Sequence, residues 1–253
     1  MNPPSKRRKQ EESMVEEVPL ASVLEWFDTT KKPTTILCRE TESKRINDFL
    51  SSCLDNEKGG SLYICGSPGI GKSLLMNNIL SALKSDRKGR VKIVTVNAMT
   101  LQKNQDLYSI LGEQLLKQKQ PWEKAKQSLE DTLFKKTSRK KAPLILCIDE
   151  IDKLLTKERS IVYDLFEWPY SSPNPIIVIG IANSIDLVEK SLPLLKIGHD
   201  RKPDTFVFPS YTAYDLKAIL VQRVALCTAA THTASVLFHP TAVELLTKKV
   251  VRP

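Results

Sequence analysis

The stretch Gly66-Ser67-Pro68-Gly69-Ile70-Gly71-Lys72-Ser73 decides the fold of this chain. It has the spacing G-x-x-x-x-G-K-[ST], which is typical of a loop that binds the phosphates of a nucleoside triphosphate. Residues 61–65 before it have the apolar pattern of a short buried strand, and residues 74–83 after it have the pattern of a helix. The motif requires this order of strand, loop and helix, so the sequence predicts a nucleotide site here.

Each residue type in this loop has a chemical reason. The glycines let the backbone turn tightly, so that successive N–H groups can point at one anion. The helix that begins near Lys72 adds its positive dipole end at the same place. Lys72 is then expected to reach the β- and γ-phosphates, and the Ser73 hydroxyl to bind Mg²⁺. The alternative is a glycine-rich turn that precedes a helix and binds no ligand.

The composition sets bounds on the rest of the chain. With 253 residues, of which 41% are hydrophobic, it is long enough for one large α/β domain or two small ones. No apolar run reaches the length of a membrane span, and the N-terminus lacks the apolar segment of a signal peptide. The five cysteines are scattered without a C-x-x-C pair, which predicts a reduced intracellular protein without a zinc site or disulfide framework.

The chain has 38 Lys and Arg and 29 Asp and Glu, which gives a net charge of +9. Two short runs contain nine basic residues, so without them the chain would be formally neutral. These residues are Lys6, Arg7, Arg8 and Lys9 in the first run, and Lys135, Lys136, Arg139, Lys140 and Lys141 in the second. The first run is compatible with nuclear import or with a solvated tail. The second is better explained as a solvated loop than as a contact with nucleic acid.

Apolar strands alternate with amphipathic helices along the chain. Strands are predicted at residues 61–65, 91–96, 144–148, 175–182 and 205–208. Helices are predicted at residues 42–54, 74–83, 107–115, 122–133, 161–168 (ending at Pro169) and 214–227. This alternation favours an α/β fold with a parallel sheet that is covered by helices on both faces. We expect a disordered tail over residues 1–30, a nucleotide-binding domain over residues 31–210, and the beginning of a helical lid over residues 211–253.

Two further strand ends carry polar residues that suit triphosphate chemistry. Asp149 and Glu150 directly follow the apolar strand at residues 144–148, and Asn183 ends the next one. Asp149 is expected to face the Mg²⁺ held by Ser73, while Glu150 orients and deprotonates water. A neutral amide at Asn183 is expected to hold that water or the γ-phosphate. The alternatives are an acidic strand end at the surface and a turn-forming asparagine.

With these residues in place, the chain resembles the AAA+ ATPases of the replication-initiator branch. The resemblance is greatest to cell division control protein 6 and next to the large subunit of the origin recognition complex. It covers roughly residues 33–250 and is carried by four stretches: Cys38-Arg39-Glu40, residues 61–73, residues 148–154, and residues 163–187, which include Phe166-Glu167-Trp168-Pro169 and Gly180-Ile181-Ala182-Asn183. A weaker likeness continues through Phe208-Pro209-Ser210-Tyr211-Thr212.

The resemblance implies a three-layer nucleotide-binding domain and a set of named parts. Residues 66–73 correspond to Walker A, Asp149 and Glu150 to Walker B, and Asn183 to sensor 1. Arg39 and Glu40 would lie beside the adenine, and Leu74 would complete the nucleotide-binding residues. The implied cofactors are ATP and Mg²⁺. The implied setting is the nucleus, where such proteins join the origin recognition complex on DNA and help to load the minichromosome maintenance helicase.

Two departures limit what the family implies. Leu194 stands where the family places an arginine, and Arg201 is only a loose candidate for an arginine finger. The sensor 2 arginine and the winged-helix domain that follow in the family are absent from this sequence. We therefore expect a shortened chain that is a weak ATPase dependent on partners and that contacts DNA weakly. The alternative is an interaction module of the same assembly that binds ATP without hydrolysing it.

Overall fold

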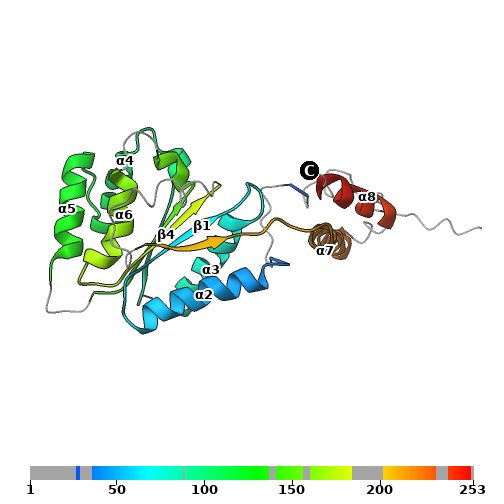
Figure 1. Ribbon diagram of the computed structural model, residues 1–253, viewed down its shortest axis with the longest axis horizontal. Coiled ribbons are helices and arrows are strands. Elements are labelled where there is room, and N and C mark those ends of the chain that lie inside the picture. The colour runs from blue at the N-terminus through cyan, green and yellow to red at the C-terminus, as the bar shows by residue number, and fades with distance from the viewer. Residues whose placement is uncertain are drawn as a thin grey trace, which may run out of the picture. The chain divides into compact units, whose positions relative to one another are not determined.

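The computed structural model describes residues 27–28, 36–87, 89–136, 141–155, 160–183, 202–231 and 239–251 (Figure 1). The chain divides into two compact units. One comprises residues 36–211, and the described part of the other includes residues 212–231 and 239–251. The predictions for the tail before residue 27, for Leu194 and Arg201, and for residues 137–140 of the second basic run lie outside the described residues.

A parallel five-stranded sheet is the centre of the larger unit. Its strands lie in the order β2-β3-β4-β1-β5. Their bounds are β1 Gly60–Cys65, β2 Lys92–Asn97, β3 Leu144–Asp149, β4 Ile176–Ala182 and β5 Asp204–Val207. β1 and β4 are buried along their whole length, as their continuous apolar sequences require. The order sets β4 between β1 and β3, so the residues that follow these three strands meet at one edge of the sheet.

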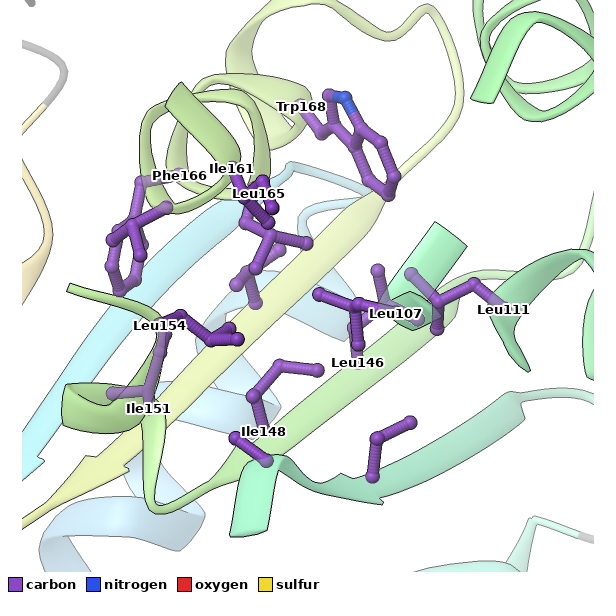
Figure 2. Close-up of a cluster of buried hydrophobic side chains, with 14 of the residues drawn as sticks. Leu107, Leu111, Leu146, Ile148, Ile151, Leu154, Ile161, Leu165, Phe166 and Trp168 are labelled. Carbon is purple, nitrogen blue, oxygen red and sulfur yellow. The ribbon is translucent and has the colours of Figure 1, made fainter. Parts of the chain in front are cut away.

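Helices cover both faces of this sheet, which confirms the predicted three-layer α/β fold (Figure 1). On one face lie α4 Asp106–Leu116, α5 Trp122–Phe134 and α6 Ser160–Ser171. On the other lie α2 Glu40–Asp55 and α3 Lys72–Asp86. Figure 2 shows the first core, where Leu107 and Leu111 of α4 and Leu165 and Phe166 of α6 meet strand residues such as Leu146.

The helix α6 continues past Pro169, so the predicted end at this proline is wrong. A proline within a helix loses one N–H, here the one that would bond to the carbonyl four residues earlier. Pro169 lies in the last turn of α6, which closes with the Ser172 N–H donating to the Trp168 carbonyl at 3.1 Å. A Cβ added at Gly59 would lie 2.1 Å from the Pro169 carbonyl oxygen, so this contact requires glycine.

The smaller unit contains α7 Ala213–Thr231 and α8 Pro240–Val251, which pack against each other. Asp215 accepts hydrogen bonds from the N–H and the hydroxyl of Thr212, at 2.8 and 2.7 Å, and its own N–H donates to that hydroxyl at 3.2 Å. This reciprocal cap fixes where α7 begins. None of the helices in the described residues is long and apolar enough to cross a membrane.

Candidate functional site

The predicted phosphate-binding loop runs from the end of β1 into the first turn of α3. Gly71 is the residue before the helix and has a φ of 86°, a left-handed conformation that favours glycine. Gly71 has no side chain, so the residue before α3 cannot cap the first N–H groups of the helix. A Cβ at Gly66 would lie 2.8 Å from the carbonyl oxygen of Phe208. The glycines therefore allow a tight turn and leave an uncapped helix N-terminus, which is a ready anion site.

Lys72 is held by uncharged oxygen atoms. Its side chain is buried, with 5% of the residue exposed. The Nζ atom donates to the carbonyl oxygens of Gly66 and Ser67, both at 2.8 Å, and to Oδ1 of Asn183 at 3.0 Å. Burial lowers the pKa of this amine, while the nearby carboxylates of Glu150, Asp149 and Asp152 act in the opposite direction.

Ser73 and Asp149 lie in direct contact. The Ser73 hydroxyl donates to Oδ1 of Asp149 at 2.9 Å, and the Glu150 N–H donates to the same oxygen at 3.1 Å. Glu150 itself has a φ of 54°, which turns the chain sharply after β3. A hydroxyl and a carboxylate side by side are oxygen ligands of the kind that Mg²⁺ prefers, so these residues fit the metal that the sequence implied.

Asn183 joins the lysine to the carboxylate. Its Nδ2 donates to Oε2 of Glu150 at 2.5 Å, while its Oδ1 accepts from Lys72. Asn183 can make both contacts because it follows β4, which pairs with β1 on one side and with β3 on the other. The structure thus brings together five predicted site residues from three neighbouring strand ends, in a set that we name the strand-end network: Lys72, Ser73, Asp149, Glu150 and Asn183.

The other residues predicted for nucleotide binding lie around this network. Ser67, Pro68 and Gly69 are exposed at the tip of the loop, Ile70 is buried beneath it, and Leu74 is half-buried in the first turn of α3. The exposed tip and the buried base are what a loop needs if its backbone, and not its side chains, is to contact a ligand.

Arg39 lies under the loop rather than in the open, and Glu40 is exposed at the start of α2. The Arg39 guanidinium is 2% exposed and forms an ion pair with Glu42 at 2.9 Å. Its Nη2 donates to the carbonyl oxygens of Ile70 at 3.1 Å and Pro209 at 2.9 Å. The ring of Tyr211 stacks on the guanidinium, with its centre 3.9 Å from Cζ. Arg39 therefore fastens the loop to the segment after β5.

Three residues near the site were missed by the sequence reasoning. The ion pair of Arg39 with Glu42 could have been predicted from the sequence, because the residue before a helix lies close to the third residue within it. The position of Tyr211 over Arg39 has none, because it depends on the pairing of β5 with β1. Asp152 accepts the Asn183 backbone N–H at 3.3 Å, a contact across 31 positions that a motif does not show.

Comparison with known proteins identifies the family. Residues 62–199 match the family model described as AAA, the ATPase family associated with various cellular activities. The chain belongs to this family. This AAA ATPase is also similar to replication initiators, as the sequence predicted. It is 36% identical to cell division control protein 6 homolog B of Arabidopsis thaliana over 247 residues, which cover 93% of this chain and 46% of the relative.

Two further comparisons agree with the initiator branch of the AAA family. The human cell division control protein 6 homolog is 33% identical over 195 residues, covering 77% of this chain and 35% of the relative. A solved structure of Drosophila ORC bound to DNA matches with a TM-score of 0.77 and 26% identity, covering 98% of this chain and 60% of that one. This chain therefore spans less than half the length of the Arabidopsis and human relatives.

Proposed function

We propose that this chain is an ATP-binding initiator ATPase that acts in the licensing of DNA replication. The observation that carries the proposal is the strand-end network, in which Asn183 contacts both the lysine of the phosphate loop and the glutamate after β3. A nucleotide-hydrolysing site needs a cation for the phosphates, oxygen ligands for Mg²⁺ and a base for water. All three are within one connected set of side chains.

The phosphates would be bound from the loop side of the site. The N–H groups of residues 66–73 and the start of α3 supply hydrogen bonds, and the Lys72 amine supplies a positive charge. Ser73 and Asp149 would hold Mg²⁺, which neutralises phosphate charge when it is bound. The three protons of the Lys72 amine are donated to protein oxygen atoms in this structure, so at least one of these hydrogen bonds would be exchanged for one to a phosphate.

Glu150 and Asn183 would act on the water side. Oε2 of Glu150 would accept a proton from water, and the Asn183 amide would orient the glutamate and the water. The left-handed turn at Glu150 directs its side chain toward β4, where Asn183 lies 2.5 Å from it.

The biological setting of the proposal comes from the relatives. Their names place them in cell division control and in the origin recognition complex. We accordingly propose that this chain works in the nucleus, joins origin recognition complex subunits on DNA, and helps to load the minichromosome maintenance helicase. ATP would act there as a switch for assembly more than as fuel. Contact with DNA should weaken steeply with salt, because phosphate contacts release counterions.

Replacing Glu150 tests the catalytic part of this proposal. The Glu150→Gln variant keeps the size and hydrogen bonding of the side chain but removes the base, so we expect retained nucleotide binding with lost turnover. Binding of a fluorescent ATP analogue and release of phosphate are the two measurements, with and without origin recognition complex subunits. Glu123→Gln on the exposed side of α5 is the matched control. Turnover by Glu150→Gln at the parent rate would show that Glu150 is not the base.

A second function is favoured by the same short contact. The Asn183 amide donates to Oε2 of Glu150, so this oxygen is already engaged by a protein donor. The alternative is thus an interaction module that binds ATP without hydrolysing it. Binding without turnover, both alone and with partner subunits, would establish this alternative. Turnover that partner subunits stimulate would exclude it.

A further inference from the structure

A short 3₁₀ helix, η2 (Ile151–Leu154), directly follows Glu150 and is attached to β4. Its Asp152 is half-buried, and Oδ2 of this residue accepts the backbone N–H of Asn183 at 3.3 Å. This N–H lies one residue beyond β4, where the ladder with the neighbouring strands has ended. The Asp152 carboxylate therefore takes the place of a strand partner at the point where Asn183 leaves the sheet.

A second contact holds η2 on the same strand. Ile151 is fully buried, and it fills the space beside Gly180 of β4. A Cβ at Gly180 would lie 3.0 Å from Cδ1 of Ile151, closer than ordinary packing allows. Figure 2 shows Ile151 and Leu154 of η2 in the core together with Phe166 of α6. Ile151 thus fixes where η2 lies, and Asp152 fixes the end of β4 against it.

The contacts of Ile151 and Asp152 with β4 lie within a few residues of the Glu150 and Asn183 side chains. Asp152 is two residues from Glu150, and it binds the main chain of Asn183 itself. The Asn183 side chain then returns to Glu150, which closes a ring of contacts. Free movement of Asn183 would separate its amide from either Lys72 or Glu150, since it must reach both.

We propose that Asp152 is a positioning residue, whose carboxylate holds the Asn183 main chain so that the Asn183 side chain bridges Lys72 and Glu150. Asp152 itself makes no contact with the nucleotide in this proposal. Its part in turnover rests on the function proposed above, whereas its part in holding Asn183 does not. A carboxylate suits the task because a charged acceptor forms a stronger hydrogen bond with an N–H than a neutral one does.

The structural part is tested by hydrogen exchange at the Asn183 amide, followed by NMR in the nucleotide-free chain. Asp152→Ala removes the acceptor, so the amide should exchange faster than in the parent. Asp152→Asn keeps an oxygen that can accept the same hydrogen bond, so it should retain most of the protection. Asp131→Asn, on the exposed side of α5, is the matched control and should match the parent. Parent-like exchange in Asp152→Ala would overturn the proposal.

The functional part is tested by separating turnover from affinity. Loss of a supporting contact outside the ligand's reach commonly costs about tenfold or more in activity. We expect Asp152→Ala to lower the turnover rate by about this factor while ATP affinity stays near the parent value, and Asp152→Asn to recover most of the rate. Equal losses in Asp152→Ala and Asp152→Asn would contradict a role through the hydrogen bond, as would a loss confined to affinity.

The two variants also keep the test decisive if one of them folds poorly. If Asp152→Ala fails to fold, Asp152→Asn alone decides. Retained protection of the Asn183 amide in this variant would support the proposed hydrogen bond to residue 152, and lost protection would contradict it. If the parent itself releases no phosphate under any condition, the proposed hydrolysis fails. The exchange at Asn183 still decides whether Asp152 holds this residue.

Discussion

Two lysines in this molecule are held in opposite ways. Lys72 is 5% exposed, and its amine donates to two carbonyl oxygens and one amide oxygen. The Lys126 side chain of α5 is 33% exposed, and its amine forms ion pairs with Asp164 at 2.6 Å and Glu130 at 3.8 Å. Asp164 also accepts the Tyr108 hydroxyl at 2.6 Å, so Tyr108, Lys126 and Asp164 form what we name the helical cluster.

The difference separates a binding group from a structural one. In the part of the chain that the structure describes, Lys72 makes no ion pair, although it is the more buried of the two. Burying a charge without a direct counterion is costly, and a site bears that cost when an anionic ligand supplies the missing charge. In the helical cluster Asp164 already supplies the counterion of Lys126, so this lysine has no unpaired charge for a ligand. The cluster instead links the helices α4, α5 and α6.

Replacing Lys72 should have the largest effect. Lys72→Met keeps the apolar stem and removes the amine. Hydrogen bonds to a charged group contribute about 3 kcal/mol at most, so we expect ATP affinity to fall by about 100-fold. Titration with a fluorescent ATP analogue in the presence of Mg²⁺ measures this fall. Lys126→Met is the matched control, and its affinity should equal that of the parent. A similar loss of affinity in both variants would remove the distinction between the two lysines.

Replacing Asp164 should reverse the pattern and affect stability instead. In Asp164→Ala the buried Tyr108 hydroxyl loses its acceptor, and the Lys126 amine keeps only the longer ion pair with Glu130, at 3.8 Å. An unsatisfied polar group costs about 1–3 kcal/mol, and the partial exposure of Lys126 keeps the expected loss near 2 kcal/mol. Urea unfolding, followed by circular dichroism, gives the change. Unchanged stability together with weakened ATP binding would mean that the helical cluster takes part in the nucleotide site.

The pH dependence should show the smallest effect and a definite sign. Because burial lowers the pKa of Lys72, its amine loses its proton below the ordinary lysine value near pH 10.4. ATP affinity should therefore fall as the pH rises through the lowered pKa. The sign for stability is the opposite, since a group with a lowered pKa in the folded state opposes folding while it is protonated.

The comparison with Lys72→Met isolates this effect from other titrating groups. As the pH rises between the lowered pKa and the ordinary lysine value, the parent should gain stability relative to the variant. Affinity titrations and urea unfolding at several pH values between about 7 and 10 provide both curves. A constant difference in stability, with constant parent affinity, would show that Lys72 does not titrate in this range.

Much of the sheet and its phosphate loop could be predicted from local sequence. Continuous apolar runs such as residues 144–148 are long enough to be strands and too short to be helices, and the loop motif fixed the place of the first helix after β1. Even so, Pro169 misled the prediction of where α6 ends. A proline removes one hydrogen bond, and near the end of a helix the lost bond is tolerated.

The candidate site was predictable as a set of residues and not as a set of contacts. The order of polar strand ends predicted that Lys72, Asp149 and Asn183 would come together. It did not show that Arg39 would reach carbonyls 31 and 170 positions away, or that Asp152 would hold the Asn183 main chain. Such contacts depend on which strands are neighbours, and short-range periodicity carries no information about that order.

Hydrogen exchange with and without MgATP is the most direct test of the central claim, that the strand-end network is the nucleotide site and the helical cluster is not. Binding slows the opening of the regions that the ligand contacts. We predict slower exchange in residues 66–73 and at Glu150 and Asn183, with no change around Tyr108 and Asp164. Unchanged exchange in the phosphate loop at saturating MgATP, or slowing centred on the helical cluster, would contradict the account.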